Sequence, residues 1–113
     1  MANPVLQFGC SSMVLILGLT VALSTRAQTL GDVAKGREYA QSVCAACHNV
    51  LPGGKTSPIA AATPFQAIAD TSGMTGTALT VFFRTPHKSM PNLIIAGDNA
   101  DNIIAYILSL KDN

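Results

Sequence analysis

The amino-acid sequence predicts a single small all-α domain. Apolar residues recur at helical spacing in residues 31–44 and, over a broader face, in residues 98–110. No stretch of the sequence reads confidently as a strand, which would alternate apolar and polar residues. With 113 residues, the chain has room for one domain.

The N-terminal residues are expected to be an export signal. Residues 13–23, MVLILGLTVAL, form an uncharged apolar run that is short for a membrane-spanning helix and suits the core of a signal peptide. Small residues at Thr25 and Ala27 predict cleavage after Ala27, giving a signal over residues 1–27 and a mature domain over 28–113; cleavage after Ser24 is the alternative. No Lys or Arg precedes the run, and extended back to Phe8 it becomes long enough to span. A retained N-terminal anchor is therefore the rival interpretation, and only then would the protein associate with a membrane.

The expected mature domain is formally neutral. Arg26 is the only basic residue among residues 1–27, so six basic and six acidic side chains remain. Without a basic stripe, a nucleic-acid partner is not expected. A domain this small has a modest hydrophobic core, and a bound metal or cofactor would help to explain its stability.

The first helix is predicted over residues 31–44, with Asp32 as its cap. Gly36 lies in the middle of this helix, where glycine costs about 1 kcal/mol relative to alanine. We therefore expect Gly36 to allow the backbone of another helix to approach closely.

Residues 49–97 predict two short helices between loops. Residues 49–64 form a long loop dense in Pro, Gly, Ser and Thr, and a loop of this length in a small domain usually lies against a functional site. Thr63 as a cap and Pro64 at the first helical position predict a short helix that follows. Residues 75–85 predict another helix, which Pro86 ends. Residues 87–97 are expected to be irregular.

The last helix has the clearest pattern in the chain. Asp98 is expected to cap it, and Asp101 is favourably placed in its first turn near the positive end of the helix. A broad apolar face follows, formed by Ile103, Ile104, Tyr106, Ile107, Leu108 and Leu110.

The candidate site is the segment VCAACHNV, residues 43–50, in which Cys44, Cys47 and His48 form a Cys-x-x-Cys-His pattern. A disulfide redox centre would need the cysteine pair at the start of a helix that follows a strand, and this pair comes near a helix end. A structural zinc site needs four ligands, and after cleavage only these three and His87 are available. Covalent haem needs two thiols on one helical face and an adjacent imidazole for the iron, which this spacing supplies. The pattern therefore favours haem c attached through Cys44 and Cys47, with His48 as an iron ligand.

A second iron ligand is expected from a methionine. Met90 stands in the irregular segment SMPN, which can pass across a haem face, and thioether ligation suits electron-transfer iron. The alternatives are Met74, His87 and Lys88. The ordinary role of a methionine is to fill the core, and this role competes with ligation at both methionines.

The mature chain resembles the small class I cytochromes c of bacteria. The resemblance lies in four segments in the family's order: GREYAQSVCAACH, SPIAAATPF, HKSMPN and NIIAYILSL. It implies an all-α fold wrapped around one covalent haem c per chain, with the first and last helices crossing at right angles and Gly36 in contact near Tyr106. It also implies that a loop prolyl carbonyl accepts the N–H of His48; Pro58 and Pro64 compete for this role, and we favour Pro64. Ala40 departs from members that carry an aromatic residue there.

The function expected from this resemblance is one-electron transfer in the periplasm, between redox partner proteins that the sequence does not name. No pair of catalytic side chains is left once the haem ligands are assigned, so we do not expect an enzyme. A vacant sixth iron position would instead indicate a haem-based sensor or small-ligand binding protein. A third possibility is a permanent haem subunit of a dehydrogenase or oxidase complex.

Overall fold

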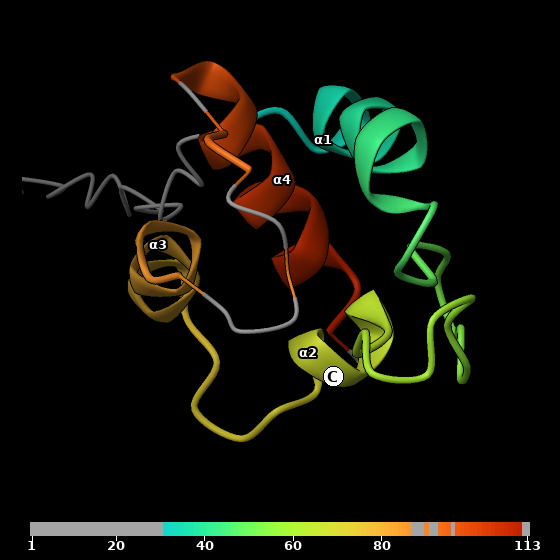
Figure 1. Cartoon of the computed structure of the whole chain (residues 1–113). Helices are drawn as coiled ribbons and strands as arrows, with labels where there is room; N and C mark the ends of the chain where they lie inside the picture. Colours follow the sequence, from blue (N-terminus) through green and yellow to red (C-terminus); the bar gives the residue numbers. More distant parts are fainter. Residues whose placement is uncertain (1–30, 87–89, 91–92, 96, 112–113) are drawn as a thin grey trace, which may run out of the picture.

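The computed structural model describes residues 31–86, 90, 93–95 and 97–111. Within them the chain forms the α-helices α1 (Val33–Tyr39), α2 (Phe65–Ala69), α3 (Gly76–Arg84) and α4 (Asp98–Ser109), and the π-helix η1 (Ala40–Cys44) (Figure 1). No strand occurs in this part of the chain, so the predicted all-α class is confirmed. The expected signal at residues 1–27 and the candidate ligands His87 and Lys88 lie outside the described residues. None of the described helices is long and apolar enough to cross a membrane.

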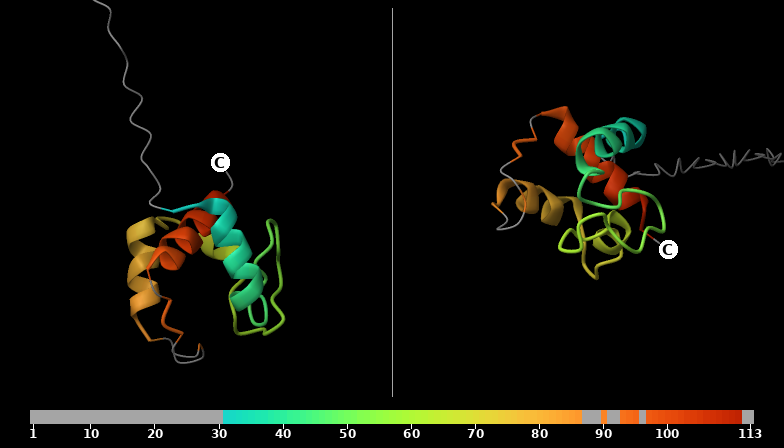
Figure 2. Two further views of the ribbon diagram at one scale, coloured as in Figure 1. Left: turned by 90° about the horizontal axis from the view of Figure 1, so that it is seen from above. Right: turned by 45° about the vertical axis from the view of Figure 1, so that its right-hand side comes forward.

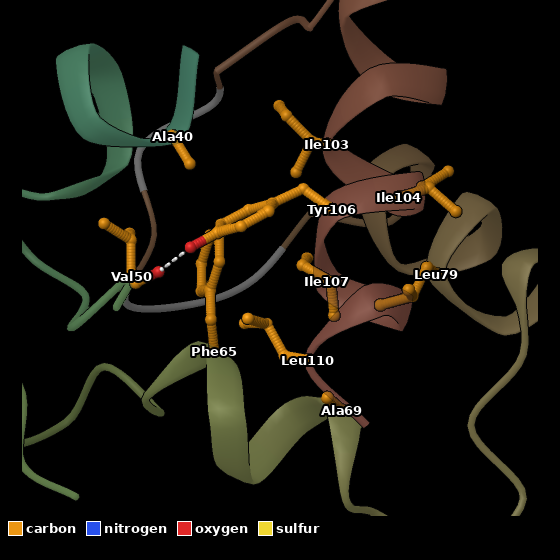
Figure 3. Close-up of a cluster of buried hydrophobic side chains, with 10 residues drawn as sticks. All are labelled: Ala40, Val50, Phe65, Ala69, Leu79, Ile103, Ile104, Tyr106, Ile107 and Leu110. Atoms are coloured by element: carbon orange, nitrogen blue, oxygen red, sulfur yellow. Dashed lines mark hydrogen bonds between the residues drawn. The ribbon is translucent and has the colours of Figure 1, made fainter. Parts of the chain in front are cut away.

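Helix α4 is the centre of the arrangement. Figures 1 and 2 show it between α1 and α3, with α2 near its C-terminal end, and it packs against all three. The buried core, drawn in Figure 3, has five members on α4 or directly after it, which confirms most of the predicted apolar face; Leu108 is half-buried. The core consists of Ala40, Val50, Phe65, Ala69, Leu79, Ile103, Ile104, Tyr106, Ile107 and Leu110.

The contact between α1 and α4 requires glycine. Gly36 is buried, and a methyl group placed on it would overlap the backbone carbonyl of Asn102 and crowd Cβ of Tyr106. Gly31 is equally close to the backbone carbonyl of Asp101. The predicted close approach at Gly36 is therefore confirmed, and Gly31, just before α1, makes a second close contact with the adjacent residue of α4.

Asp32 caps α1 as the sequence predicted. Its carboxylate accepts hydrogen bonds from the backbone N–H groups of Lys35 (3.0 Å) and Ala34 (2.8 Å), and these bonds hold the pKa of the exposed carboxyl below its usual value. The N–H of Asp32 donates in turn to Oδ1 of Asn102, at 2.7 Å. Asn102 is the one buried polar side chain among the described residues, and this bond explains its burial.

Beyond Tyr39 the first helix changes its winding. Residues 40–44 form the π-helix η1, in which the N–H of Ala45 donates to the carbonyl of Ala40 at 3.0 Å. Because a π-turn contains one more residue than an α-turn, the residues after Ala40 are rotated relative to the predicted α-helical pattern. Val43, which that pattern places on the apolar face, is 37% exposed.

Two predicted caps are wrong. Gly97, with φ of 58°, is the N-cap of α4, and no side chain caps this helix. Asp98 is already inside the first turn, where its charge, like that of Asp101, still interacts favourably with the helix dipole. Helix α2 begins at Phe65 with Pro64 as its N-cap, so Thr63 does not cap it.

Helix α3 follows the prediction at both ends. The side chain of Thr75 caps it by accepting the N–H of Ala78 at 3.1 Å. The helix ends at Arg84, and Thr85 is extended, as is usual for a residue before proline.

We expect Gly36→Ala to destabilise the protein by about 3 kcal/mol, because the added methyl group must force α1 away from α4. Chemical unfolding measures this. Gly76→Ala is the matched control: its methyl would meet Ile104 and Leu108 at 3.6 and 3.8 Å, which are ordinary contacts. Equal unfolding midpoints for the two variants would contradict the proposed role of Gly36.

Candidate functional site

The cysteine pair and the histidine lie on one turn where η1 ends. Cys44 is the last residue of η1, and its carbonyl accepts the N–H groups of Cys47 (3.1 Å) and His48 (2.9 Å). Both thiols are free and half-buried. Burial, together with the nearby Cys47, raises the pKa of the Cys44 thiol to about 11, so this thiol is protonated at neutral pH. The structure thus brings Cys44, Cys47 and His48 together, as the sequence predicted.

His48 is held by a loop that is far from it in the sequence. Its Nδ1 is 2.7 Å from the backbone carbonyl of Thr63. A carbonyl can only accept a hydrogen bond, so we assign the proton to Nδ1. Nε2 then carries the lone pair and is the atom available to a metal.

The prediction that Pro64 or Pro58 accepts this hydrogen bond is wrong; the acceptor is Thr63. The carbonyl of Pro64 instead accepts the N–H of Ile68 at 3.1 Å, the first hydrogen bond of α2. As the N-cap of α2, Pro64 directs its carbonyl along the helix, and the carbonyl one residue earlier serves His48. Pro64 itself was a usable signal, because a proline often stands where a helix starts, and its carbonyl is then taken by the first helical hydrogen bond.

Two buried aromatic rings link His48 to α4. The Phe65 ring centroid is 5.6 Å from that of His48 and 6.5 Å from that of Tyr106, and both pairs are tilted. The Tyr106 hydroxyl donates to the carbonyl of Val50 at 2.6 Å (Figure 3). Burial raises the pKa of Tyr106, an effect that the nearby Arg37 partly opposes, so the phenol stays neutral and able to donate. Sequence analysis assigned no role to Phe65.

The methionine candidates differ in their surroundings. Met74 is half-buried against the hydrophobic core, which is the usual place of a methionine. Met90 is also half-buried, but it lies in a bend and is not among the described side chains that pack against that core. The ligand role of Met90 therefore stays a prediction. No group of three or more His, Cys, Asp or Glu side chains suited to a metal ion occurs among the described residues.

One curated relative has a similar sequence over most of the chain. Cytochrome c-552 of Bradyrhizobium diazoefficiens is 32% identical over 95 residues, which cover 84% of this chain and 90% of the relative. The chain belongs to the c-type cytochromes. No protein-family model matches the sequence of this cytochrome, and no solved structure matches it.

Membership in this family implies a covalently attached haem, and the residues present fit it. Haem attachment requires two free thiols at the Cys-x-x-Cys-His spacing, and Cys44 and Cys47 supply them. A histidine that binds the haem iron would need an accessible ring nitrogen on a fixed ring, and the bond to Thr63 leaves Nε2 of His48 for that purpose. The donor set of this cytochrome is therefore that of a haem attachment site.

We expect Tyr106→Phe to lower the free energy of unfolding by about 1–3 kcal/mol, because the buried carbonyl of Val50 loses its side-chain donor. Chemical unfolding of the haem-loaded cytochrome measures this. The matched control is Tyr39→Phe, since the half-buried Tyr39 hydroxyl has no hydrogen bond to the described residues. A Tyr106→Phe variant as stable as this control would contradict the expectation.

Proposed function

We propose that this cytochrome is a one-electron carrier of the class I type with one haem c per chain. Cys44 and Cys47 would form the thioether bonds, and His48 and Met90 would bind the iron. The bound haem supplies an iron atom that takes up and releases single electrons. The observation that carries the proposal is the 2.7 Å contact between His48 Nδ1 and the Thr63 carbonyl, beside two free cysteines at haem-attachment spacing.

The role of the chain is to keep the iron ligands still during electron transfer. His48 is held by the Thr63 carbonyl on one side of its ring and by the tilted Phe65 ring nearby. This hydrogen bond increases the basicity of the imidazole. A Met90 thioether would favour the reduced iron more than a second histidine would. No residue of the chain is assigned a catalytic role, and the protein is proposed not to be an enzyme.

The proposed location is the periplasm, reached with residues 1–27 as the signal and residues 28–113 as the mature domain. The partners would be redox proteins that dock near the thioether-bearing cysteines. Ile59, 49% exposed, lies next to Cys47, because its N–H donates to the Cys47 carbonyl at 3.2 Å. Val43, 37% exposed, directly precedes Cys44 in the chain. Each of the two cysteines thus has an exposed uncharged side chain nearby, on a domain of balanced charge. Carrier interfaces of this kind are small and transient.

The ligand set is tested by absorption spectroscopy of the exported holoprotein. We expect a low-spin spectrum with the sulfur-to-iron charge-transfer band, and no change when carbon monoxide is added to the reduced protein. Met90→Ala should lose the band and bind carbon monoxide. Met74→Ala is the matched control and should behave like the wild type, because Met74 packs against the core. A wild-type protein that binds carbon monoxide readily and lacks the band would instead indicate a small-ligand sensor.

The docking surface is tested by the salt dependence of electron transfer. Because Ile59 and Val43 are uncharged and the mature domain is formally neutral, we expect the second-order rate with the partner protein to change little as ionic strength rises. Ile59→Lys should introduce a salt dependence that the wild type lacks. A steep fall of the wild-type rate with salt would count against the uncharged docking surface.

A further inference from the structure

Asn49, the residue directly after His48, has all of its polar groups in hydrogen bonds. Its backbone N–H donates to Oγ of Ser57 at 2.9 Å, and its side-chain Nδ2 donates to the carbonyl of Thr56 at 2.9 Å. Its side-chain Oδ1 accepts the N–H of Leu51 at 3.1 Å. Its backbone carbonyl accepts the N–H of Phe65 at 2.9 Å. These four hydrogen bonds fix the position of this half-buried residue.

The loop is folded tightly over the Asn49 amide. Residues 51–54, LPGG, form a turn in which the N–H of Gly54 donates to the carbonyl of Leu51 at 3.1 Å. Pro52 and Gly53, with φ of 70°, occupy the central positions, as in a type II turn. Gly54 lies directly against the amide, and a methyl group on it would overlap the side-chain atoms of Asn49.

The hydrogen bonds of Asn49 reach the segment that holds His48. Phe65, whose N–H binds the Asn49 carbonyl, is two residues beyond Thr63. On the other side of His48, the Cys47 carbonyl accepts the N–H of Ile59. Residues 47, 48 and 49 therefore bind the loop at Ile59, Thr63 and Phe65, respectively. Thr63 thus lies between two other points at which the loop is held.

We propose that the Asn49 side chain positions His48: by binding Leu51 and Thr56 it keeps the loop folded so that the Thr63 carbonyl stays on Nδ1. This assignment rests on the proposed function, in which His48 binds the haem iron. A loop released from Asn49 would weaken the hydrogen bond to Nδ1 and make the imidazole a poorer electron donor to the iron. The oxidised state would lose stabilisation, and the reduction potential would rise.

The test compares haem-loaded Asn49→Ala with the wild type and with Asn102→Ala. Asn49→Ala removes the two side-chain bonds, with Thr56 and Leu51, and keeps the backbone bonds with Ser57 and Phe65. The control removes an asparagine that also binds a backbone N–H, but that joins α1 to α4 away from His48. In the reduced protein, NMR measures exchange of the His48 Nδ1 proton with solvent. We expect this exchange to become about tenfold faster in Asn49→Ala, because the loop loses both side-chain bonds, and the reduction potential to rise. Asn102→Ala should lose stability and keep both properties.

Gly54→Ala gives an independent test that leaves Asn49 in place, and it also serves if Asn49→Ala does not accumulate. Its methyl group displaces the Asn49 amide, so it should reproduce the faster exchange and the higher potential. Gly76→Ala, whose methyl makes ordinary contacts, should not. Suppose that the wild-type spectrum shows His48 on the iron, but that Asn49→Ala and Gly54→Ala leave the Nδ1 proton exchange and the reduction potential unchanged. This result would overturn the role of Asn49 and leave the proposed function standing. A wild-type spectrum without histidine ligation would overturn the proposed function and the assignment together.

Discussion

The close approach of α1 to α4 is the constraint on which the rest of the molecule depends. Gly36 in α1 and Gly31 just before it bring the chain against the backbone carbonyls of Asn102 and Asp101. The buried Asn102 side chain then joins the same two segments by accepting the N–H of Asp32. Helix α1 continues directly into η1, which ends at Cys44. The glycine contact therefore positions the helix that leads to the two cysteines, while His48 is held in addition by the Thr63 carbonyl.

The site has a second half, which comes from the loop and is held by polar contacts. The Thr63 carbonyl binds His48, the Asn49 carbonyl binds the N–H of Phe65, and Tyr106 on α4 binds the carbonyl of Val50. Gln66 adds a further link, since its amide accepts the N–H of Gly53 and donates to the carbonyl of Leu110. The loop thus obtains a fixed conformation from hydrogen bonds to α2 and α4. The loop can therefore hold the His48 imidazole in place although it has no hydrophobic core of its own.

Apolar periodicity predicted the helices well because it reports which face is buried, and the face of α4 agrees with the structure almost residue by residue. Gly36 was also predictable, since a mid-helix glycine has a cost that close packing can justify. The cap at Asp32 was correct, whereas those at Asp98 and Thr63 were not, because a glycine or proline beside each of them already occupies the N-cap.

The Thr63 carbonyl was missed because a backbone acceptor has no signature in its own side chain. The η1 winding was missed because residues 40–44 carry no distinctive sequence signal for a π-turn. The iron role of Met90 was not tested by the geometry around it.

The π-helix between α1 and the cysteines has a consequence for comparing relatives of this protein. Each residue of an α-helix turns the chain by about 100°. The additional residue in η1 therefore determines the direction in which Cys44 and Cys47 point relative to the face of α1 that packs on α4. A relative with a one-residue deletion in this segment would not simply have a shorter helix. Its two cysteines would point in another direction unless α1 itself rolled on α4, so a one-residue gap here would redirect the thiols that are proposed to hold the haem.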